Sequence, residues 1–440
     1  MRSARIIPSL VVAFWCCQSL WAAPLELLPE ELVVSDSRNY QMSRNPNHSM
    51  TVARDGTVHL VFWDDAYLDT SPAHPSTVWY CRRDPSGRWR SPEIVDDSYT
   101  SGTIRVGGRH PSIVLRSNGE IRVFWHDYRN CSAAKKWINN TEIYMDTRPS
   151  GGLFSPNDVR LTSTTATHDG DNGYAPRAIL SPTGEILAAW HDYHFNRNAA
   201  DIFLARSDTQ GRFNPTLPID SFRLTNVSQR AGGDSYTLPD LALDASNTVH
   251  LVWTRDNLAG YGVYYARLKS GSSLSAPVVL SSTGGDFLDA PHITASPRGD
   301  IFVLWTEYGT ANGDSDIVVA RLRRGASLFD PPFTVTGNLS NQFHGDLKVD
   351  ALGLLHVVWA DERNGRDEIF YGAFDPESKV LLSEMKISQG DGDAVRPAIA
   401  LDQRSSAYVA WMDDRNGQGS IYFRAIMQPT QARVTWTLYR

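Results

Sequence analysis

The side chains best suited to chemistry in this sequence are two histidines, a tyrosine and an arginine. His126 lies in WHDYRN and His191 in WHDYHF, while Tyr174 and Arg177 stand between them in the chain. Phenol and imidazole groups serve as general bases, and a guanidinium binds a carboxylate through two parallel hydrogen bonds. We therefore predict that Tyr174 or a histidine removes the proton beside the carboxyl group of a uronate sugar, while Arg177 or Arg109 neutralises that carboxylate.

Further arginine, histidine and aspartate residues stand near a position that recurs along the chain, usually as proline. The set predicted to bind a substrate consists of Arg109, His110, Asp240, His292, His344, Asp346 and Arg396. Such a mixture suits an anionic sugar, because guanidinium groups bind carboxylate or sulfate bidentately. The alternative is that these residues pair with one another around the axis of the fold and bind no ligand.

One loop has the composition of a metal site. The segment HDGDNG, from His168 to Gly173, places Asp169 and Asp171 close together. This resembles part of a calcium loop but lacks its terminal glutamate. Similar segments, GGDSY and GDGD, occur elsewhere in the chain, which favours a turn role instead. The cofactor is therefore left open, with calcium as the metal hypothesis; calcium uptake by EDTA-treated protein in equilibrium dialysis would test it.

The N-terminus has the layout of a secretory signal peptide. Basic residues in MRSAR precede the apolar run IIPSLVVAFWCCQSLW, and small residues follow at Ala22 and Ala23. We expect residues 1–23 to be removed and the protein to be secreted or periplasmic. No later stretch approaches the ~20 apolar residues of a membrane helix, and the residues before Cys16 do not resemble a lipobox, so no membrane anchor is expected.

The remaining composition excludes some partners. Only Cys81 and Cys131 follow the predicted leader, and an oxidising compartment would permit one disulfide between them. The formal net charge is −7, without clustered lysine and arginine, which argues against a nucleic-acid partner. We expect a monomer whose partner is an acidic glycan or another protein.

An aromatic residue that follows a short apolar run recurs seven times, at intervals of roughly 50 to 65 residues. These aromatic positions are Phe62, Trp125, Trp190, Trp253, Trp305, Trp359 and Trp411. Fourteen residues before each of them stands proline or a substitute for it. The proline-equivalent positions are His48, Pro111, Pro176, Pro239, Pro291, Gly345 and Pro397.

Each repeat predicts about four short strands. In the second repeat, PSIVLRS and EIRVFWHD are two strands joined by an Asn-Gly turn, and EIYM and SPNDVRLTS supply the next two. No helical pattern separates them. The sequence therefore predicts an all-β fold, a seven-bladed β-propeller of four-stranded antiparallel blades, as a single domain over residues 24–440.

The ends of the chain predict how the ring closes. The seventh repeat runs out into QPTQARVTWTLYR, while LLPEELVVSDS near the N-terminus resembles the fourth-strand segment SPEIVDDS. We predict that residues 27–37 form the outer strand of the last blade and leave the ring without an open edge. Residues 428–440 then form a tail, unless VTWTLYR takes that place instead.

A carboxylate follows the aromatic residue by two positions in six repeats. These acidic residues are Asp64, Asp127, Asp192, Glu307, Asp361 and Asp413. A site that occurs once per molecule cannot be built from a feature that most blades share. We predict a structural role, in which the carboxylate accepts backbone N–H groups at the strand end and pairs with a nearby arginine.

The combination of strand, W-x-D-x-R-N-G, E-I-Y and a Gly-containing turn resembles the BNR or Asp-box repeats of the sialidase-like propeller superfamily. DPSGRW and DTQGRF look like degenerate Asp boxes, but the Phe/Tyr-Arg-Ile-Pro motif of sialidases is absent. The seven blades are also similar, in architecture, to propeller polysaccharide lyases such as ulvan lyases. These resemblances imply activity on glycans, with His, Tyr and Arg around the propeller mouth.

Two functions remain open from the sequence. The first is an exported protein that acts on or binds an acidic glycan, uronate-like or sialate-like, as a polysaccharide lyase or glycoside hydrolase. The second is a non-enzymatic propeller that binds a protein partner or serves as an assembly module. Because the repeat accounts for most conspicuous motifs, only residues that do not repeat can separate the two.

Overall fold

The computed structural model describes most of the chain. The described ranges are residues 25–43, 46–64, 76–96, 107–129, 141–162, 173–196, 198–214, 219–226, 235–257, 260–283, 290–309, 314–336 and 338–428. The predicted signal peptide, Asp169, Asp171, Cys131 and residues 429–440 lie outside these ranges. The signal peptide, the calcium loop, the disulfide and the C-terminal tail therefore stay predictions. Cys81 itself is fully buried.

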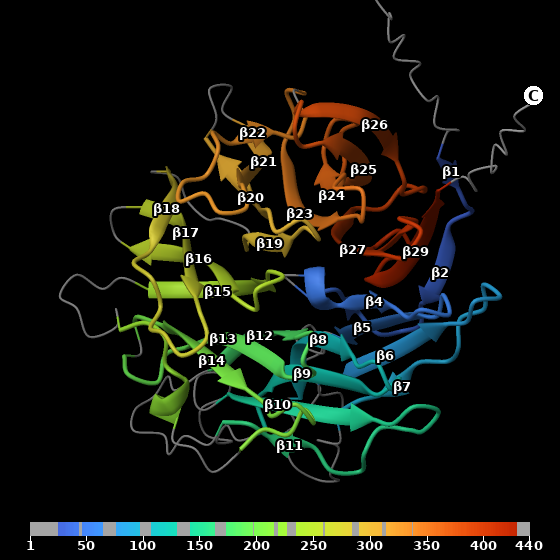
Figure 1. Cartoon of the computed structure of the whole chain (residues 1–440). Helices are drawn as coiled ribbons and strands as arrows, with labels where there is room; N and C mark the ends of the chain where they lie inside the picture. Colours follow the sequence, from blue (N-terminus) through green and yellow to red (C-terminus); the bar gives the residue numbers. More distant parts are fainter. Residues whose placement is uncertain are drawn as a thin grey trace, which may run out of the picture.

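Seven sheets stand around a common axis, each a blade of the predicted propeller (Figure 1). Blades 1 and 2 consist of β3 (Tyr40–Gln41), β4 (Met50–Val52), β5 (Val58–Asp64), β6 (Val78–Arg83) and β7 (Glu93–Ile94), then β8 (Gly108–Leu115), β9 (Ile121–Asp127), β10 (Glu142–Arg148) and β11 (Val159–Arg160). Blades 3 to 5 consist of β12 (Gly173–Leu180), β13 (Ile186–Asp192) and β14 (Asp201–Arg206), then β15 (Ser235–Leu243), β16 (Val249–Asn257), β17 (Gly260–Leu268) and β18 (Val278–Thr283), then β19 (His292–Ala295), β20 (Ile301–Tyr308), β21 (Ser315–Leu322) and β22 (Phe333–Thr334). Blades 6 and 7 consist of β23 (Gln342–Val349), β24 (Leu355–Asp361), β25 (Glu368–Asp375) and β26 (Val380–Lys386), then β27 (Ala394–Leu401), β28 (Ala407–Asp413) and β29 (Ser420–Met427) with β1 (Glu26–Leu27) and β2 (Glu31–Val34).

The all-β, seven-bladed fold and its antiparallel blades are confirmed, with one local difference. In the described part of blade 3 three strands are paired, and a single bridge between Phe203 and Arg223 stands where a fourth strand would be. The described residues also contain two short 3₁₀ turns, η1 (Pro46–His48) and η3 (Ile219–Phe222). Among the described residues no helix is long and apolar enough to cross a membrane.

The repeating tryptophans are the anchors of the blades. Trp125, Trp190 and Trp359 are fully buried, and each stacks on an aromatic residue of the third strand, as Trp125 does on Tyr144 with ring centroids 6.2 Å apart. Burying one such side chain removes ~150–250 Å² from water, a gross gain of about 4–6 kcal/mol. One anchor per blade therefore explains the period of the sequence.

The carboxylate two residues after the tryptophan has the predicted structural role. Asp361 accepts hydrogen bonds from Trp359 Nε1 at 3.0 Å and from the backbone N–H and Nη2 of Arg363 at 2.9 and 2.7 Å. Asp127 makes the corresponding contacts with Trp125 and Arg129. In blades 2 and 6 the motif therefore holds the strand end to its own tryptophan and loop, whereas in blade 7 Asp413 bonds to Arg415 and Trp411 Nε1 has no partner among the described residues.

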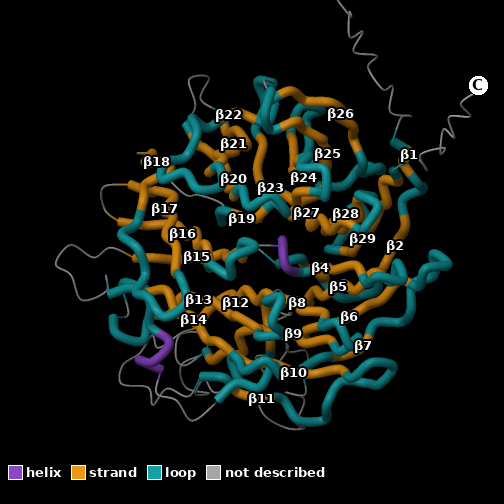
Figure 2. The backbone as a smooth tube through the Cα atoms, viewed as in Figure 1, coloured by secondary structure: helices purple, strands orange, loops and turns teal. Residues whose placement is uncertain are grey.

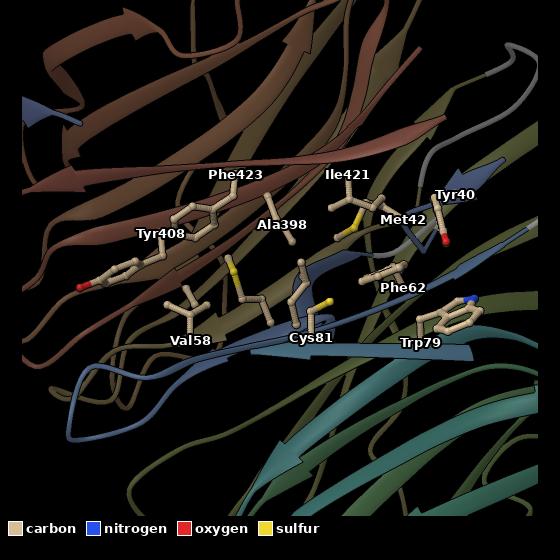
Figure 3. Packing of buried hydrophobic residues seen from close by; sticks show 14 of the residues in the cluster. Tyr40, Met42, Val58, Phe62, Trp79, Cys81, Ala398, Tyr408, Ile421 and Phe423 are labelled. Atoms are coloured by element: carbon tan, nitrogen blue, oxygen red, sulfur yellow. The ribbon is translucent and has the colours of Figure 1, made fainter. Parts of the chain in front are cut away.

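The N-terminal segment closes the ring, as predicted. Both β1 and β2 pair antiparallel with β29, the third strand of blade 7. Glu31 extends the closure to blade 1, because it accepts hydrogen bonds from Arg83 at 2.6 and 2.8 Å and from Trp89 at 2.9 Å. The seam between the first and last blades is packed with apolar side chains, among them Phe62 and Phe423 (Figure 3).

Candidate functional site

The strand directions define two faces of the ring. The innermost strand of each blade starts, and its second strand ends, on one face, which we call the mouth. The turns between the first and second strands lie on the opposite face, as at Asn118 and Gly119, where glycine takes a φ of 81° that other residues rarely adopt. Every residue that the sequence placed in a catalytic or binding role, apart from the aspartates outside the described ranges, lies at the mouth or along the axis below it.

A bulge at the start of the innermost strand recurs around the mouth. Five residues there have left-handed backbone with φ between 48° and 55°: His110, Ala175, Leu238, His344 and Arg396. The strand register shifts at each of these positions. Bulges change the direction of side chains and are frequent beside functional sites. A bulge that recurs in five blades is a structural feature of the fold and does not mark a functional site by itself. His110, His344 and Arg396 were selected from sequence at these bulges.

Tyr174 joins the two predicted catalytic histidines. The centroid of its ring lies 5.1 Å from that of His126 in blade 2 and 5.5 Å from that of His191 in blade 3. Tyr128 and Tyr193 pack against the same rings, each within 6.5 Å of Tyr174. The structure therefore brings together three of the four residues predicted to be catalytic.

Both histidines are held in one tautomer. The Nδ1 atom of His126 accepts the backbone N–H of Ala175 at 3.1 Å, and Nδ1 of His191 accepts that of Leu238 at 3.3 Å. An acceptor nitrogen carries no proton, so the proton of each neutral ring lies on Nε2. Each bond links a histidine to the bulge of the next blade, and it leaves Nε2–H as a donor.

Burial and nearby cations keep these histidines neutral. Burial lowers the pKa of His191 to about 3, aided by the positive charge of Arg177. Burial also lowers the pKa of His126 well below its ordinary value, and Arg109 and Arg177 add to the effect. Near neutral pH the two rings are hydrogen-bond donors and are unsuited to removing a proton.

Arg109 brings positive charge to the same cluster. Its guanidinium carbon lies 4.9 Å from the ring centre of Trp63 and 5.4 Å from that of Tyr128, and its Nε donates to Ser76 Oγ at 2.9 Å. Stacking of arginine on aromatic rings fixes the plane of the guanidinium. His110 packs between Trp63 and His126, with centroid distances of 5.2 and 5.3 Å.

We call this group the mouth cluster; it consists of Trp63, Arg109, His110, His126, Tyr128, Tyr174, His191 and Tyr193. Three of its aromatic residues, Trp63, Tyr128 and Tyr193, were not selected from the sequence. The signal for the tyrosines was present, because WHDY occurs in blades 2 and 3 only. Trp63 was hidden beside Phe62, which takes the repeat position.

The predicted binding residues Asp240 and Asp346 lie deeper and connect blades. Asp240 Oδ2 accepts the backbone N–H of Ile293 in the next blade at 2.8 Å, and Asp346 Oδ2 does the same for Ile399. Ser112 makes the corresponding contact with Ala178 at 3.0 Å. Both carboxylates are fully buried. They thus hold neighbouring innermost strands together.

The remaining predicted residues of the axis are Arg177 and His292, both buried. Arg177 donates from Nη1 to the carbonyl of Pro176 at 2.8 Å and from Nη2 to Ser43 Oγ at 3.3 Å. Burial lowers its pKa to about 10, against the opposing charges of Asp240 and Asp346. His292 Nδ1 lies 3.7 Å from Asp346 Oδ1, and burial lowers the pKa of His292 to about 4. We call Arg177, Asp240, His292 and Asp346 the axis cluster.

A turn of blade 1 enters the axis. The η1 turn lies at the centre of the ring (Figure 2), between β3 and β4, and contacts the innermost strands of four other blades. His48 Nε2 lies 2.7 Å from Asp240 Oδ1, the Asn47 amide donates to Asp240 Oδ2, and Lys348 Nζ donates to the Asn47 carbonyl at 3.1 Å. Although burial alone would raise the pKa of Asp240, His48 and His292 hold it below its ordinary value. The turn therefore lies at the axis and contacts the axis cluster through Asp240.

The last two predicted binding residues lie on the mouth at blades 6 and 7. His344 packs on Phe343, with ring centroids 4.9 Å apart. Arg396 Nη1 donates to Gln41 Oε1 at 2.9 Å. The described residues do not contain a group of three or more His, Cys, Asp or Glu that could hold a metal ion.

Comparisons with known proteins rest on structure. No family model and no curated protein matches the sequence. An ulvan lyase of a new polysaccharide lyase family is 10% identical over 92% of this chain and 96% of its own, with a TM-score of 0.63. A second polysaccharide lyase is 10% identical over 91% of this chain and 99% of its own, with a TM-score of 0.57.

A Hadza microbial sialidase is also similar, at 12% identity and a TM-score of 0.50, over 88% of this chain and 65% of its own. This chain therefore spans less than two thirds of that sialidase. At such identities the similarity establishes the fold alone. The chain has the β-propeller fold that these polysaccharide lyases and this sialidase share, built here from seven blades.

Proposed function

We propose that this protein acts on an acidic polysaccharide at the mouth cluster, as a carbohydrate-active propeller. The observation that carries the proposal is Tyr174 packed between two neutral histidines, with Arg109 stacked on aromatic rings beside them. Aromatic faces bind sugar rings, and a guanidinium selects a carboxylate or sulfate. None of these four side chains is part of the repeat that builds the blades.

The reaction that fits these groups best is elimination from a uronate. The reacting form of Tyr174 is the phenolate. Its Oη takes the proton from the carbon beside the carboxylate, and the electrons of that C–H bond form a C=C double bond as the glycosidic C–O bond breaks. The leaving oxygen receives the proton from Tyr174. Arg109 and the Nε2–H groups of His126 and His191 donate to the carboxylate, where negative charge accumulates in the transition state.

Arg177 has an indirect part in this proposal. Its guanidinium is fully buried and bonded to Pro176 and Ser43, so it does not reach a polymer at the mouth. Its charge lowers the pKa values of His126 and His191 and so favours the neutral, donating form of both rings. Arg109, which the sequence offered as the alternative, is the guanidinium that we propose to contact substrate.

Hydrolysis by two carboxylates that flank the scissile bond, the usual arrangement in glycoside hydrolases, is less well supported. Asp127 and Asp192, the carboxylates at the ends of β9 and β13, already accept hydrogen bonds from their own tryptophans and from loop N–H groups. Asp240 and Asp346 are bonded to neighbouring blades. The names of the two similar lyases agree with elimination. No residue role in this proposal is taken from either of them.

A specific observation favours a second candidate, binding without turnover. The lone pairs of His126 and His191 are both occupied by backbone N–H groups, so Tyr174 has no histidine base beside it. The same cluster would then bind an acidic glycan by stacking and charge. Both candidates place the glycan on the mouth cluster, and they differ in whether Tyr174 removes a proton.

Affinity for glycan tests the location shared by both candidates. Affinity electrophoresis of the mature protein through gels that contain uronate polysaccharides should show retardation, and Arg109→Gln should weaken it at least ten-fold without a change in Tm. Arg54→Gln, an exposed substitution on the opposite face, is the control for charge. Equal retardation of parent and Arg109→Gln would contradict the proposal.

A further inference from the structure

A cleft of about 350 Å³ lies between blades 4 and 5, on the face opposite the mouth. It is formed by the turn between β15 and β16, the end of β17, the turn before β20 and the end of β21. Its volume falls within the range of small-molecule sites. None of its lining residues belongs to the mouth cluster or to the axis cluster.

The polar side chains on the floor of the cleft form hydrogen bonds with one another. His250 is buried, with Nδ1 2.6 Å from the Tyr265 hydroxyl and Nε2 3.2 Å from Asp244 Oδ2. Asp244 also accepts the Ser246 hydroxyl at 2.7 Å and the backbone N–H of Thr248 at 2.9 Å. Because these polar groups already form hydrogen bonds with one another, they have little capacity left to bind a ligand. Any specificity for a ligand must therefore come from the side chains of the rim.

The rim is cationic. Arg267, Lys269 and Arg324 line the cleft and are exposed, and no carboxylate of the described chain forms an ion pair with any of them. The neighbouring Arg323 differs, since it pairs with Asp330 at 2.9 Å and with Glu377 at 3.0 Å. Among the lining residues, three cations without a carboxylate partner outweigh Asp244, although the whole chain carries a net charge of −7. Asp300, which accepts the backbone N–H of Arg324 at 2.7 Å, pairs with Arg321.

The rim also has an apolar side. Ile301 and Leu322 lie beneath the cleft and are buried, with 1% and 5% of their surface exposed, so they offer a ligand little apolar surface. The stem of Arg324 lies over Gly299, where a Cβ would come 3.2 Å from Arg324 Cδ. The aliphatic stem of Arg324 beside these cationic groups matches a sugar ring that carries a sulfate or carboxylate group, because the ring packs on the stem while the anion meets the cations.

We propose that this cleft is a second binding site, specific for an anionic sugar residue. The site does not depend on the proposed function, because it lies on the opposite face and uses different residues. Its ligand is one ring that bears a sulfate or a carboxylate, held by Arg267, Lys269 and Arg324.

The test is a titration at low salt, followed by ligand-detected NMR, with a sulfated hexose, a uronic acid and an uncharged hexose as probes. It is carried out in an Arg109→Gln background, so that the mouth cluster contributes little. At least one anionic probe should bind and the uncharged hexose should not. The further double substitution Arg267→Gln with Arg324→Gln should weaken binding ten-fold or more, and added salt should weaken it too.

The matched control removes the same charge on the same face. Arg54 and Arg404 are exposed arginines in the first turns of blades 1 and 7. The double substitution of these two to glutamine should leave binding unchanged. The proposal is overturned if neither anionic probe binds at millimolar concentration, if the uncharged hexose binds equally, or if both double variants lose binding alike. Loss of glycan binding in Arg109→Gln alone bears on the mouth cluster and not on this cleft.

Discussion

At the scale of single residues, the carboxylates of the innermost strands stabilise the fold, although their residue type would also suit a binding site. Asp240 and Asp346 look like ligands in the sequence, yet each accepts a backbone N–H from the adjacent blade. Asp240 has further partners in Asn47 and His48. A buried carboxylate with several donors stabilises the fold strongly, because its removal leaves those donors unpaired.

Asp240→Ala should therefore lower the free energy of unfolding by about 3–5 kcal/mol, the usual cost of removing one partner of a buried charged pair. The substitution also leaves the buried Arg177 with less opposing charge. Thermal and denaturant unfolding would measure the loss. Asp391→Ala, at a side chain that is 97% exposed, is the control and should cost almost nothing. A similar small effect of both substitutions would refute the role given to Asp240.

At the scale of elements, the outer strand of blade 7 comes from the other end of the chain. Pairing of β1 and β2 with β29 covers an edge that would otherwise expose unpaired N–H and C=O groups. Glu30 adds an ion pair with Arg415, and Glu31 adds one with Arg83. The N-terminal segment thus links blade 7 to blade 1 by backbone and by charge.

A chain that starts at Asn39 should lose this closure. We expect a clear fall in Tm and self-association through the exposed edge of β29, measured by thermal unfolding and by size-exclusion chromatography. The control is a chain that starts at Leu25, which removes only residues before β1. If the shorter chain stays monomeric with an unchanged Tm, closure by β1 and β2 contributes little.

Sequence repetition also decides how much of these elements could be predicted. The tryptophan anchors and the turns follow from spacing, since each blade repeats the same local physics. The closing strand follows from the likeness of LLPEELVVSDS to a fourth-strand segment. The η1 turn does not follow from spacing, because blade 1 departs from the repeat where Asn47 and His48 enter the axis. The depth of a residue along the axis is not written in the spacing either: Arg177 is buried, whereas Tyr174, three residues earlier, is partly exposed.

The candidate site was predictable to a similar degree. His126, Tyr174 and His191 were found because they do not repeat, and they do lie together. The contacts of Arg109 with Trp63 and Tyr128 bring together residues from blades 1 and 2, and such pairings depend on how neighbouring blades pack. His344 and Arg396 share the bulge position of His110 but lie on other blades.

At the scale of the whole molecule, buried histidines in several blades link stability to pH. Burial lowers the pKa of His59 to about 4, that of His191 to about 3 and that of His292 to about 4, against 6.5 for an exposed histidine. Below pH 6.5 these histidines therefore bind protons in the unfolded chain but stay neutral in the folded chain. The stability that these groups contribute is complete above pH 6.5 and is lost as the pH falls toward 4.

Several carboxylates act in the opposite direction, Asp64, Asp96 and Asp367 among them. Burial raises the pKa values of Asp64 and Asp367 to about 6, so the folded chain binds their protons first and gains stability on acidification. The contribution of one histidine is therefore measured as the difference between the pH dependence of stability in the parent and in a variant that lacks that histidine. Between pH 6.5 and 4.5, His191→Gln should make the fall in unfolding free energy less steep, by at most about 1.4 kcal/mol per pH unit. Parallel pH profiles of parent and variant would show that His191 is not buried in its neutral form.

The central claim, that Tyr174 in the mouth cluster acts on an acidic glycan, is tested most directly by ultraviolet absorbance. Elimination creates an unsaturated uronate, whose absorbance rises during incubation of the mature protein with a panel of acidic polysaccharides. The account predicts a rise with at least one polysaccharide, a loss of more than a hundred-fold in rate in Tyr174→Phe, and an unchanged rate in Arg54→Gln. A rise that persists in Tyr174→Phe, or no rise with any polysaccharide, would contradict elimination by Tyr174.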